Sequence, residues 1–126
     1  MARSYHVDIA TFAADADRKW IDNLLSHFDV PGVDGGRQGV ARRLSLLGIC
    51  RVAMIRRLTR ELGVSAAVAV SLTGQLFETD TTHLELGPHL QLRFDRRAFE
   101  RDVETAALEA AESLAPARRG RPPARR

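Results

Sequence analysis

The chain has very little cysteine and no long apolar run. Cys50 is its only cysteine among 126 residues, so the sequence excludes an intramolecular disulfide and a metal site built from several cysteines. No stretch approaches the roughly 20 apolar residues that a membrane-spanning helix needs, and the first residues lack the apolar segment of a secretory signal. We therefore expect no membrane partner and a cytoplasmic location, at the nucleoid if the chain binds DNA.

The sequence also lacks the residue patterns of metal sites and of common enzymes. Its histidines stand apart from one another and from other metal-ligand types; they are His6, His27, His83 and His89. There is no nucleophile elbow, no phosphate-binding loop and no convincing pair of carboxylates. We therefore expect neither an enzyme nor a cofactor, and we assign no catalytic or metal-binding residue.

Lysine is nearly absent, with one lysine beside 18 arginines, and the charge is unevenly distributed. The net charge is +3, of which residues 1–60 carry +4, residues 61–115 carry −6 and residues 116–126 carry +5. Between Arg37 and Arg60 there are seven arginines and no carboxylate. A basic block of this kind, together with a basic tail, favours a polyanionic partner over a merely solvated surface.

The spacing of apolar residues predicts a mostly α-helical chain with small β elements. The expected helices span residues 7–15, 18–27, 46–62, 66–77 and 96–114. Four of them follow a residue whose side chain can cap free backbone amides, namely Asp17, Ser45, Ser65 and Asp95. Gly63 should close the third helix, and Pro116 should end the last one.

Each helix shows an apolar stripe that should face the core. The inward-facing residues are expected to be Val7, Ile9 and Phe12 in the first helix, Leu47, Met54, Ile55, Leu58 and Leu62 in the third, and Phe99, Val103, Ala106, Ala110 and Leu114 in the last. Trp20 belongs to the stripe of the second helix, so we expect it in the core. Arg51 lies near the stripe of the third helix, where we expect a structural ion pair.

Two segments predict β hairpins. Residues 33–45 contain Gly35 and Gly36 and run into a short alternating stretch, which indicates a turn-rich, two-stranded wing. Residues 82–95 alternate leucine and phenylalanine with polar residues on both sides of Gly87-Pro88, which is typical of a hairpin with one apolar face.

The stretch VDIATFAADADRKWIDNLLSHFDVPGV, followed by RRLSLLGICRVAMIRRLTRELGVS, resembles the winged helix-turn-helix DNA-binding domain of MerR-like regulators. In that family the wing ends in a basic-aromatic-Ser/Thr step, and the next helix leads to ELG and a small polar residue. The corresponding segments here are Arg42 to Ser45 and Glu61 to Ser65. The chain departs from the family in two places, because its turn AADAD lacks the usual glycine and WIDNLL replaces an aromatic pair.

The resemblance covers residues 5–78 and implies a winged helix-turn-helix DNA-binding domain there. Residues 82–115 would then form a β-hairpin and a C-terminal helix that serve in packing or dimerisation. Residues 116–126 would form a basic tail, which by itself should be disordered because its composition cannot bury a core.

In the family, the second helix enters the major groove, which implies this role for residues 18–27. Its outward face offers Lys19, Asn23 and Ser26, and Arg18 stands at its start beside the phosphates. Asparagine can pair with adenine, whereas lysine suits guanine or phosphate. The alternative is an ordinary amphipathic surface helix.

Three arginines of the wing are candidates for contact with the DNA backbone or the minor groove; they are Arg37, Arg42 and Arg43. Because Arg42 and Arg43 are adjacent on a predicted strand, they should point to opposite faces, so that only one contacts DNA fully. The alternative for the wing is a loop that charge keeps soluble.

The tail contains RGRP, and its residues Arg119, Gly120 and Arg121 resemble the core of an AT-hook, which binds the narrow minor groove of A·T-rich DNA. Two interpretations are open. The tail either recognises the A·T minor groove or attracts phosphates without preference for sequence.

We therefore expect a sequence-specific protein that binds double-stranded DNA, as a small bacterial transcriptional regulator would. The alternative is a protein-interaction module such as an antitoxin, an excisionase-like recombination factor or a phage packaging subunit. In that case residues 83–114 would bind a partner protein. The same segment could instead form a homodimer or simply cover the wing domain.

Overall fold

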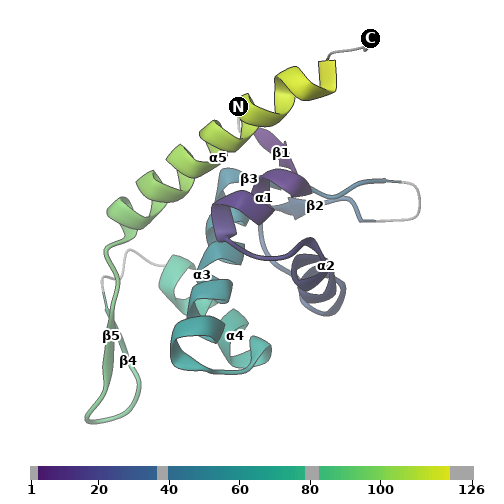
Figure 1. The fold of residues 1–126 in the computed structure, drawn as a ribbon. Helices are drawn as coiled ribbons and strands as arrows, with labels where there is room; N and C mark the ends of the chain where they lie inside the picture. Colours follow the sequence, from purple (N-terminus) through teal and green to yellow (C-terminus); the bar gives the residue numbers. More distant parts are fainter. Residues whose placement is uncertain (1–2, 37–39, 79–82, 120–126) are drawn as a thin grey trace.

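The computed structural model of the chain describes residues 3–36, 40–78 and 83–119. Along them lie β1 (Ser4–His6), α1 (Val7–Ala14), α2 (Arg18–His27), β2 (Val33–Asp34), β3 (Arg43–Ser45), α3 (Leu46–Leu62), α4 (Ala66–Glu78), β4 (His83–Glu85), β5 (Gln91–Arg93) and α5 (Arg96–Arg119). The prediction of a mostly α-helical chain with small β elements is confirmed, and the predicted order of helices, wing and hairpin is observed (Figure 1).

A three-stranded antiparallel sheet has the strand order β1-β3-β2. Leu44 of β3 lies at its centre, opposite Tyr5 of β1 on one side and Val33 of β2 on the other. Both Leu44 and Tyr5 are buried. The sequence did not predict β1, because its three residues run directly into α1 and its pairing partner lies about 40 positions away.

Helix α3 is the central element of the fold, with α1, α4 and α5 packed around it (Figure 1). Every residue from Gly48 to Ile55 is buried, so the middle of this helix has no solvent face. The predicted stripe is wrong at both ends, where Leu47 is 39% exposed and Leu62 is 51% exposed. A stripe describes a helix with one covered side, whereas α3 is surrounded at its middle and uncovered at its ends.

The start of α3 crosses the backbone before β2 at two glycines. A Cβ atom on Gly48 would lie 2.5 Å from the carbonyl oxygen of Gly32, and a Cβ on Gly32 would lie 2.5 Å from the amide nitrogen of Gly48. Gly32 also has a φ of 94°, which L-residues rarely adopt. Only glycine at both positions allows this close approach, which docks the wing onto the core.

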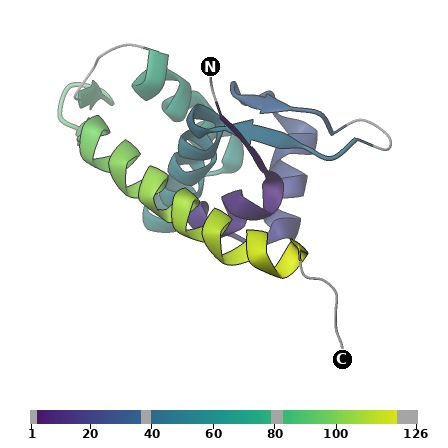
Figure 2. The same ribbon diagram turned by 90° about the horizontal axis from the view of Figure 1, so that it is seen from above.

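Helix α5 lies across α1 and α3, with Val103, Ala107 and Ala110 buried (Figures 1 and 2). In the predicted stripe of α5, Val103 and Ala110 are buried and Phe99 and Ala106 are half-buried, whereas Ala107, which was not predicted, is fully buried. The side chain of Leu114 lies outside the described residues. In α1, Phe12 is 61% exposed instead of inward. The buried side of α1 carries the small residues Ala10 and Ala14, which let neighbouring helices approach closely. This side therefore does not need a phenylalanine to fill it.

The prediction that Pro116 ends the last helix is also wrong, because α5 continues to Arg119. A proline inside a helix removes one amide donor and strains the preceding turn, but its fixed φ is itself helical. The predicted tail of residues 116–126 is therefore helical up to Arg119, and residues 120–126 lie outside the part that the structure describes.

The hairpin β4–β5 and α5 join the same core through three aromatic rings. Phe77 of α4 lies 5.3 Å from Phe94 and 6.4 Å from Phe99, measured between ring centroids, and Phe94 and Phe99 are 5.6 Å apart. The tilted and edge-on geometry is the favourable one for aromatic pairs. Phe94 and Phe99 of the segment 83–114 thus pack against the rest of the chain, whereas Leu90 at the tip of the hairpin is 60% exposed.

Candidate nucleic-acid interface

The turn between α1 and α2 takes its shape from Asp15 in place of a glycine. Asp15 has a left-handed conformation, with φ 54° and ψ 54°, and its amide bonds to carbonyls of the last turn of α1. Aspartate tolerates this conformation better than most residues. Arg60 of α3 donates one hydrogen bond to the Asp15 carbonyl oxygen and another, of 3.1 Å, to its carboxylate. Arg60 of α3 thus fixes this turn.

Helix α2 buries one side and exposes the other. Ile21 and Leu24 are buried, and Trp20 is half-buried, with the Arg56 guanidinium 5.1 Å from the centroid of its ring. Asp17 stands at the N-cap position but makes no capping hydrogen bond through its side chain, so its predicted capping role is wrong. The other three predicted caps, from Ser45, Ser65 and Asp95, are confirmed.

The exposed side of α2 contains Lys19, Asn23 and Ser26, as predicted. Within the described residues Lys19 has no hydrogen bond or ion pair, so its ammonium group is available. His27 is a further exposed residue of this side, and its Nδ1 lies 2.8 Å from the Asn23 carbonyl oxygen. Sequence reasoning set His27 aside, although its spacing of four from Asn23 and eight from Lys19 could have indicated it.

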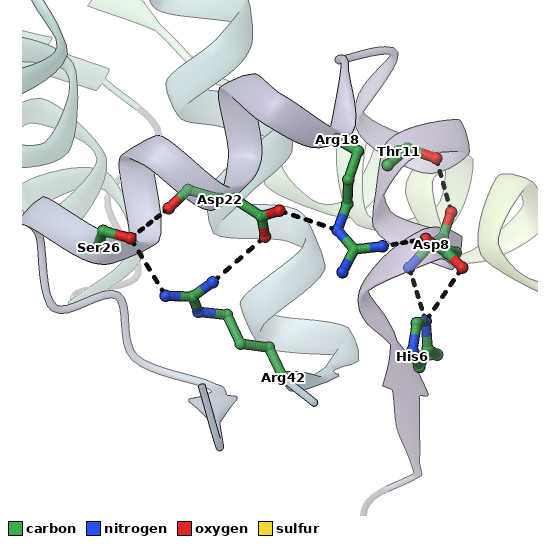
Figure 3. A network of polar contacts seen from close by, with 7 residues as sticks. All are labelled: His6, Asp8, Thr11, Arg18, Asp22, Ser26 and Arg42. Carbon is green, nitrogen blue, oxygen red and sulfur yellow. Dashed lines mark hydrogen bonds and ion pairs between the residues drawn. The ribbon is translucent and has the colours of Figure 1, made fainter. Parts of the chain in front are cut away.

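Arg18 and Arg42, two of the predicted DNA contacts, belong to an ion-pair network (Figure 3). Arg18 lies 2.6 Å from the Asp8 carboxylate and 3.1 Å from the Asp22 carboxylate. Arg42 comes from the end of the wing and lies 3.2 Å from the other Asp22 oxygen and 3.4 Å from the Ser26 hydroxyl. The Arg42 side chain is only 19% exposed. These contacts hold the wing against α2.

Arg43 points to the opposite side of the wing, as expected for the neighbour of Arg42 on a strand. Its guanidinium donates to the Ser4 hydroxyl and to the Ser4 carbonyl oxygen, both at 3.0 Å. Arg3 and Arg43 both line an open groove of about 800 Å³ between β1 and the wing. Arg3 was missed because β1 was not predicted. Of the adjacent residues Arg42 and Arg43, Arg42 is therefore the one that faces α2.

The remaining predicted DNA contacts lie at the end of α5 or outside the residues that the structure describes. Arg37 falls in residues 37–39, and Gly120 and Arg121 fall in residues 120–126, all outside the described residues. Arg119 is the last residue of α5. The C-terminal end of α5, the wing and α2 lie on the same side of the molecule, away from β4–β5 (Figures 1 and 2).

Two buried polar groups of α3 lie apart from this surface. Arg51 forms no ion pair among the described residues, so the predicted one is wrong; its guanidinium lies 5.4 Å from the Phe77 ring centroid, and burial lowers its pKa. Burial, with a smaller contribution from Glu100, raises the pKa of the Cys50 thiol to about 12. A thiol of this kind is unreactive at neutral pH.

The described residues, 3–36, 40–78 and 83–119, offer no candidate for a metal site or for a membrane-spanning helix. They contain no group of three or more histidine, cysteine, aspartate or glutamate side chains that could hold a metal ion. None of the helices in this part of the chain is long and apolar enough to cross a membrane. The surface formed by α2 and the wing is thus the best-defined candidate site. No family model, no curated protein and no solved structure matches this chain.

Proposed function

We propose that the chain binds double-stranded DNA, with α2 in the major groove and the wing on the adjacent backbone. One observation carries the proposal: α2 follows a tight turn, exposes a polar side, and is joined to the wing through Arg42, so that helix and wing form one surface. A helix of this diameter fits the major groove, and a wing beside it meets the neighbouring phosphates. By resemblance to MerR-like regulators, we propose a role in regulating transcription.

The residues of this surface suit different parts of the duplex. Asn23 and Lys19 are exposed on α2, where an amide can pair with adenine and an ammonium group with guanine or phosphate. Arg18 and Arg42 lie at its edge, where phosphates would pass. The tail, which follows α5 in the sequence, would add attraction to the backbone through its arginines.

Fluorescence anisotropy with labelled duplexes, selected from a random pool by binding to the parent protein, tests the proposal. The variant K19A/N23A should lose about 1–3 kcal/mol of binding to the selected duplex for each base contact removed. The matched control R97A/Q75A removes one cation and one amide from exposed positions of α5 and α4 and should bind as the parent does. Equal affinity of K19A/N23A and the control would refute the role of α2.

Binding of a partner protein through residues 83–114 is the competing function. The structure favours it less, because Phe94, Val103 and Ala107 are buried against the rest of the chain. A homodimer through the same segment has the same weakness. If the parent protein bound no duplex and a pull-down with it recovered a protein partner in stoichiometric amount, the competing function would be favoured.

A further inference from the structure

Asp22 is the only acidic residue of α2. It lies on the surface of α2 and the wing that would face DNA in the proposed function. Its two carboxylate oxygens are both occupied, one by Arg18 Nε at 3.1 Å and the other by Arg42 Nη1 at 3.2 Å (Figure 3). The two arginines come from the start of α2 and from the end of the wing. A single carboxylate thus joins the two cations that flank this surface.

Each of the two guanidinium groups has a second partner on the protein. Arg18 also reaches the Asp8 carboxylate of α1, and Arg42 also reaches the Ser26 hydroxyl. The Ser26 hydroxyl in turn donates to the Asp22 carbonyl oxygen at 2.7 Å. Among the described residues of α2, this leaves Lys19 as the cation with no carboxylate partner.

These ion pairs are placed where they can be exchanged. The side chains of Arg18, Asp22 and Asp8 are between 41% and 51% exposed, whereas that of Arg42 is 19% exposed, so water and salt weaken the pairs of Arg18 more than the pair of Arg42. A phosphate can take the place of a carboxylate on a guanidinium, because both accept two parallel hydrogen bonds. Each exchange breaks an intramolecular pair and brings the phosphate close to the negative charge of Asp22.

We propose that Asp22 restrains the binding of phosphate by this surface. It holds Arg18 and Arg42 in ion pairs that DNA must break before either arginine can neutralise a phosphate. The restraint acts on backbone attraction, which is the same for every sequence, and leaves the base contacts of α2 untouched. Asp22 thereby increases discrimination between a specific site and other DNA. This inference rests on the proposed function.

The variant D22N tests it, because asparagine has nearly the shape of aspartate and keeps one oxygen acceptor but removes the charge. Its affinity for a duplex of unrelated sequence should rise roughly tenfold at low salt, and the slope of log K against log salt should steepen by about 0.9 for each released arginine that meets a phosphate. Its affinity for the selected duplex should rise less. The ratio of the two affinities should therefore fall.

The matched control is D17N, which removes one negative charge from the exposed N-cap of the same helix, where the side chain makes no capping bond. It should leave the salt slope unchanged. A D22N protein whose affinity and slope equal those of D17N overturns the inference, and so does a loss of affinity, which would mean that Asp22 presents the arginines to DNA.

The background R18Q/R42Q separates release of the arginines from simple repulsion by Asp22. If Asp22 acts through the two arginines, D22N should bring no gain in this background, and circular dichroism should show all variants folded. A gain that persists there overturns the inference. This result is distinct from failure of the proposed function, in which the parent binds no duplex or K19A/N23A binds as tightly as the parent; that outcome overturns both.

Discussion

Asp15 shows how one residue can serve where a glycine is expected. It is the only non-glycine residue with positive φ in the described part of the chain, and its side chain is 86% exposed, so packing does not hold it. Its left-handed conformation is accepted because aspartate tolerates it and because Arg60 binds its carbonyl oxygen from outside the turn. The angle at which α2 leaves α1 thus depends on a residue of α3.

Replacement of Asp15 separates the conformational cost from the ion pair. D15A should lower the free energy of unfolding by about 1 kcal/mol relative to D15N, because the left-handed conformation is less favourable for alanine than for asparagine. Both variants lose the carboxylate charge, so the ion pair cancels in the comparison, although asparagine keeps one oxygen acceptor for Arg60 that alanine lacks. Urea denaturation followed by circular dichroism measures the difference. Equal midpoints for D15A and D15N would show that the turn imposes no such cost.

At the scale of elements, most local features were predictable, with the exception of the cap at Asp17, and the distant ones were not. The caps at Ser45, Ser65 and Asp95 and the C-cap at Gly63 involve residues within four positions of one another, and each is observed. Strand β1 and the exposed Phe12 depend on partners far along the chain. The exposed residues of α2 followed from helical spacing, whereas the pairing of Arg42 with Asp22 required the docked wing.

The crossing of α3 and the backbone before β2 gives a prediction for two glycines. G48A places a methyl group 2.5 Å from the Gly32 carbonyl oxygen, so the wing must move away from α3, and the free energy of unfolding should fall by about 1–3 kcal/mol. In the control G74A, the added Cβ meets nothing nearer than a Glu78 oxygen at 4.0 Å, and the variant should gain about 0.5–1 kcal/mol from its helix preference. Thermal and urea unfolding measure both. If G48A were as stable as G74A, the close approach of Gly32 and Gly48 would contribute nothing to the free energy of unfolding.

At the scale of the whole molecule, the elements that carry the proposed DNA contacts lie together. The wing, α2 and the end of α5, from which the arginine-rich tail leaves, lie on one side, and the hairpin of the acidic segment 61–115 lies on the other (Figures 1 and 2). Such an arrangement orients a protein on a polyanion before any specific contact forms.

Deletion of residues 120–126 tests the contribution of the tail. It removes three arginines and no residue of a described helix, so the free energy of unfolding should change by less than about 0.5 kcal/mol. DNA affinity should fall, and the salt slope should shrink by about 0.9 for each phosphate that the tail no longer neutralises. Anisotropy titrations at several salt concentrations measure both. G120A keeps the charge, so a selective loss of preference for A-tract duplexes in this variant would indicate minor-groove recognition. An unchanged affinity and slope after the deletion would exclude the tail from the interface.

The packing of α5 on α1 has a consequence for how the protein is made. These helices stand near opposite ends of the sequence, yet Ala10 and Ala14 of α1 are buried in a core that includes Ala107 and Ala110 of α5. During synthesis the ribosome releases α1 and α2 long before α5 exists, so a nascent chain exposes that side of α1 to chaperones and proteases. Long-range contacts of this kind slow folding, because a large loop must close before they form. The proposed DNA-binding surface therefore reaches its final support only when the last quarter of the chain has been translated.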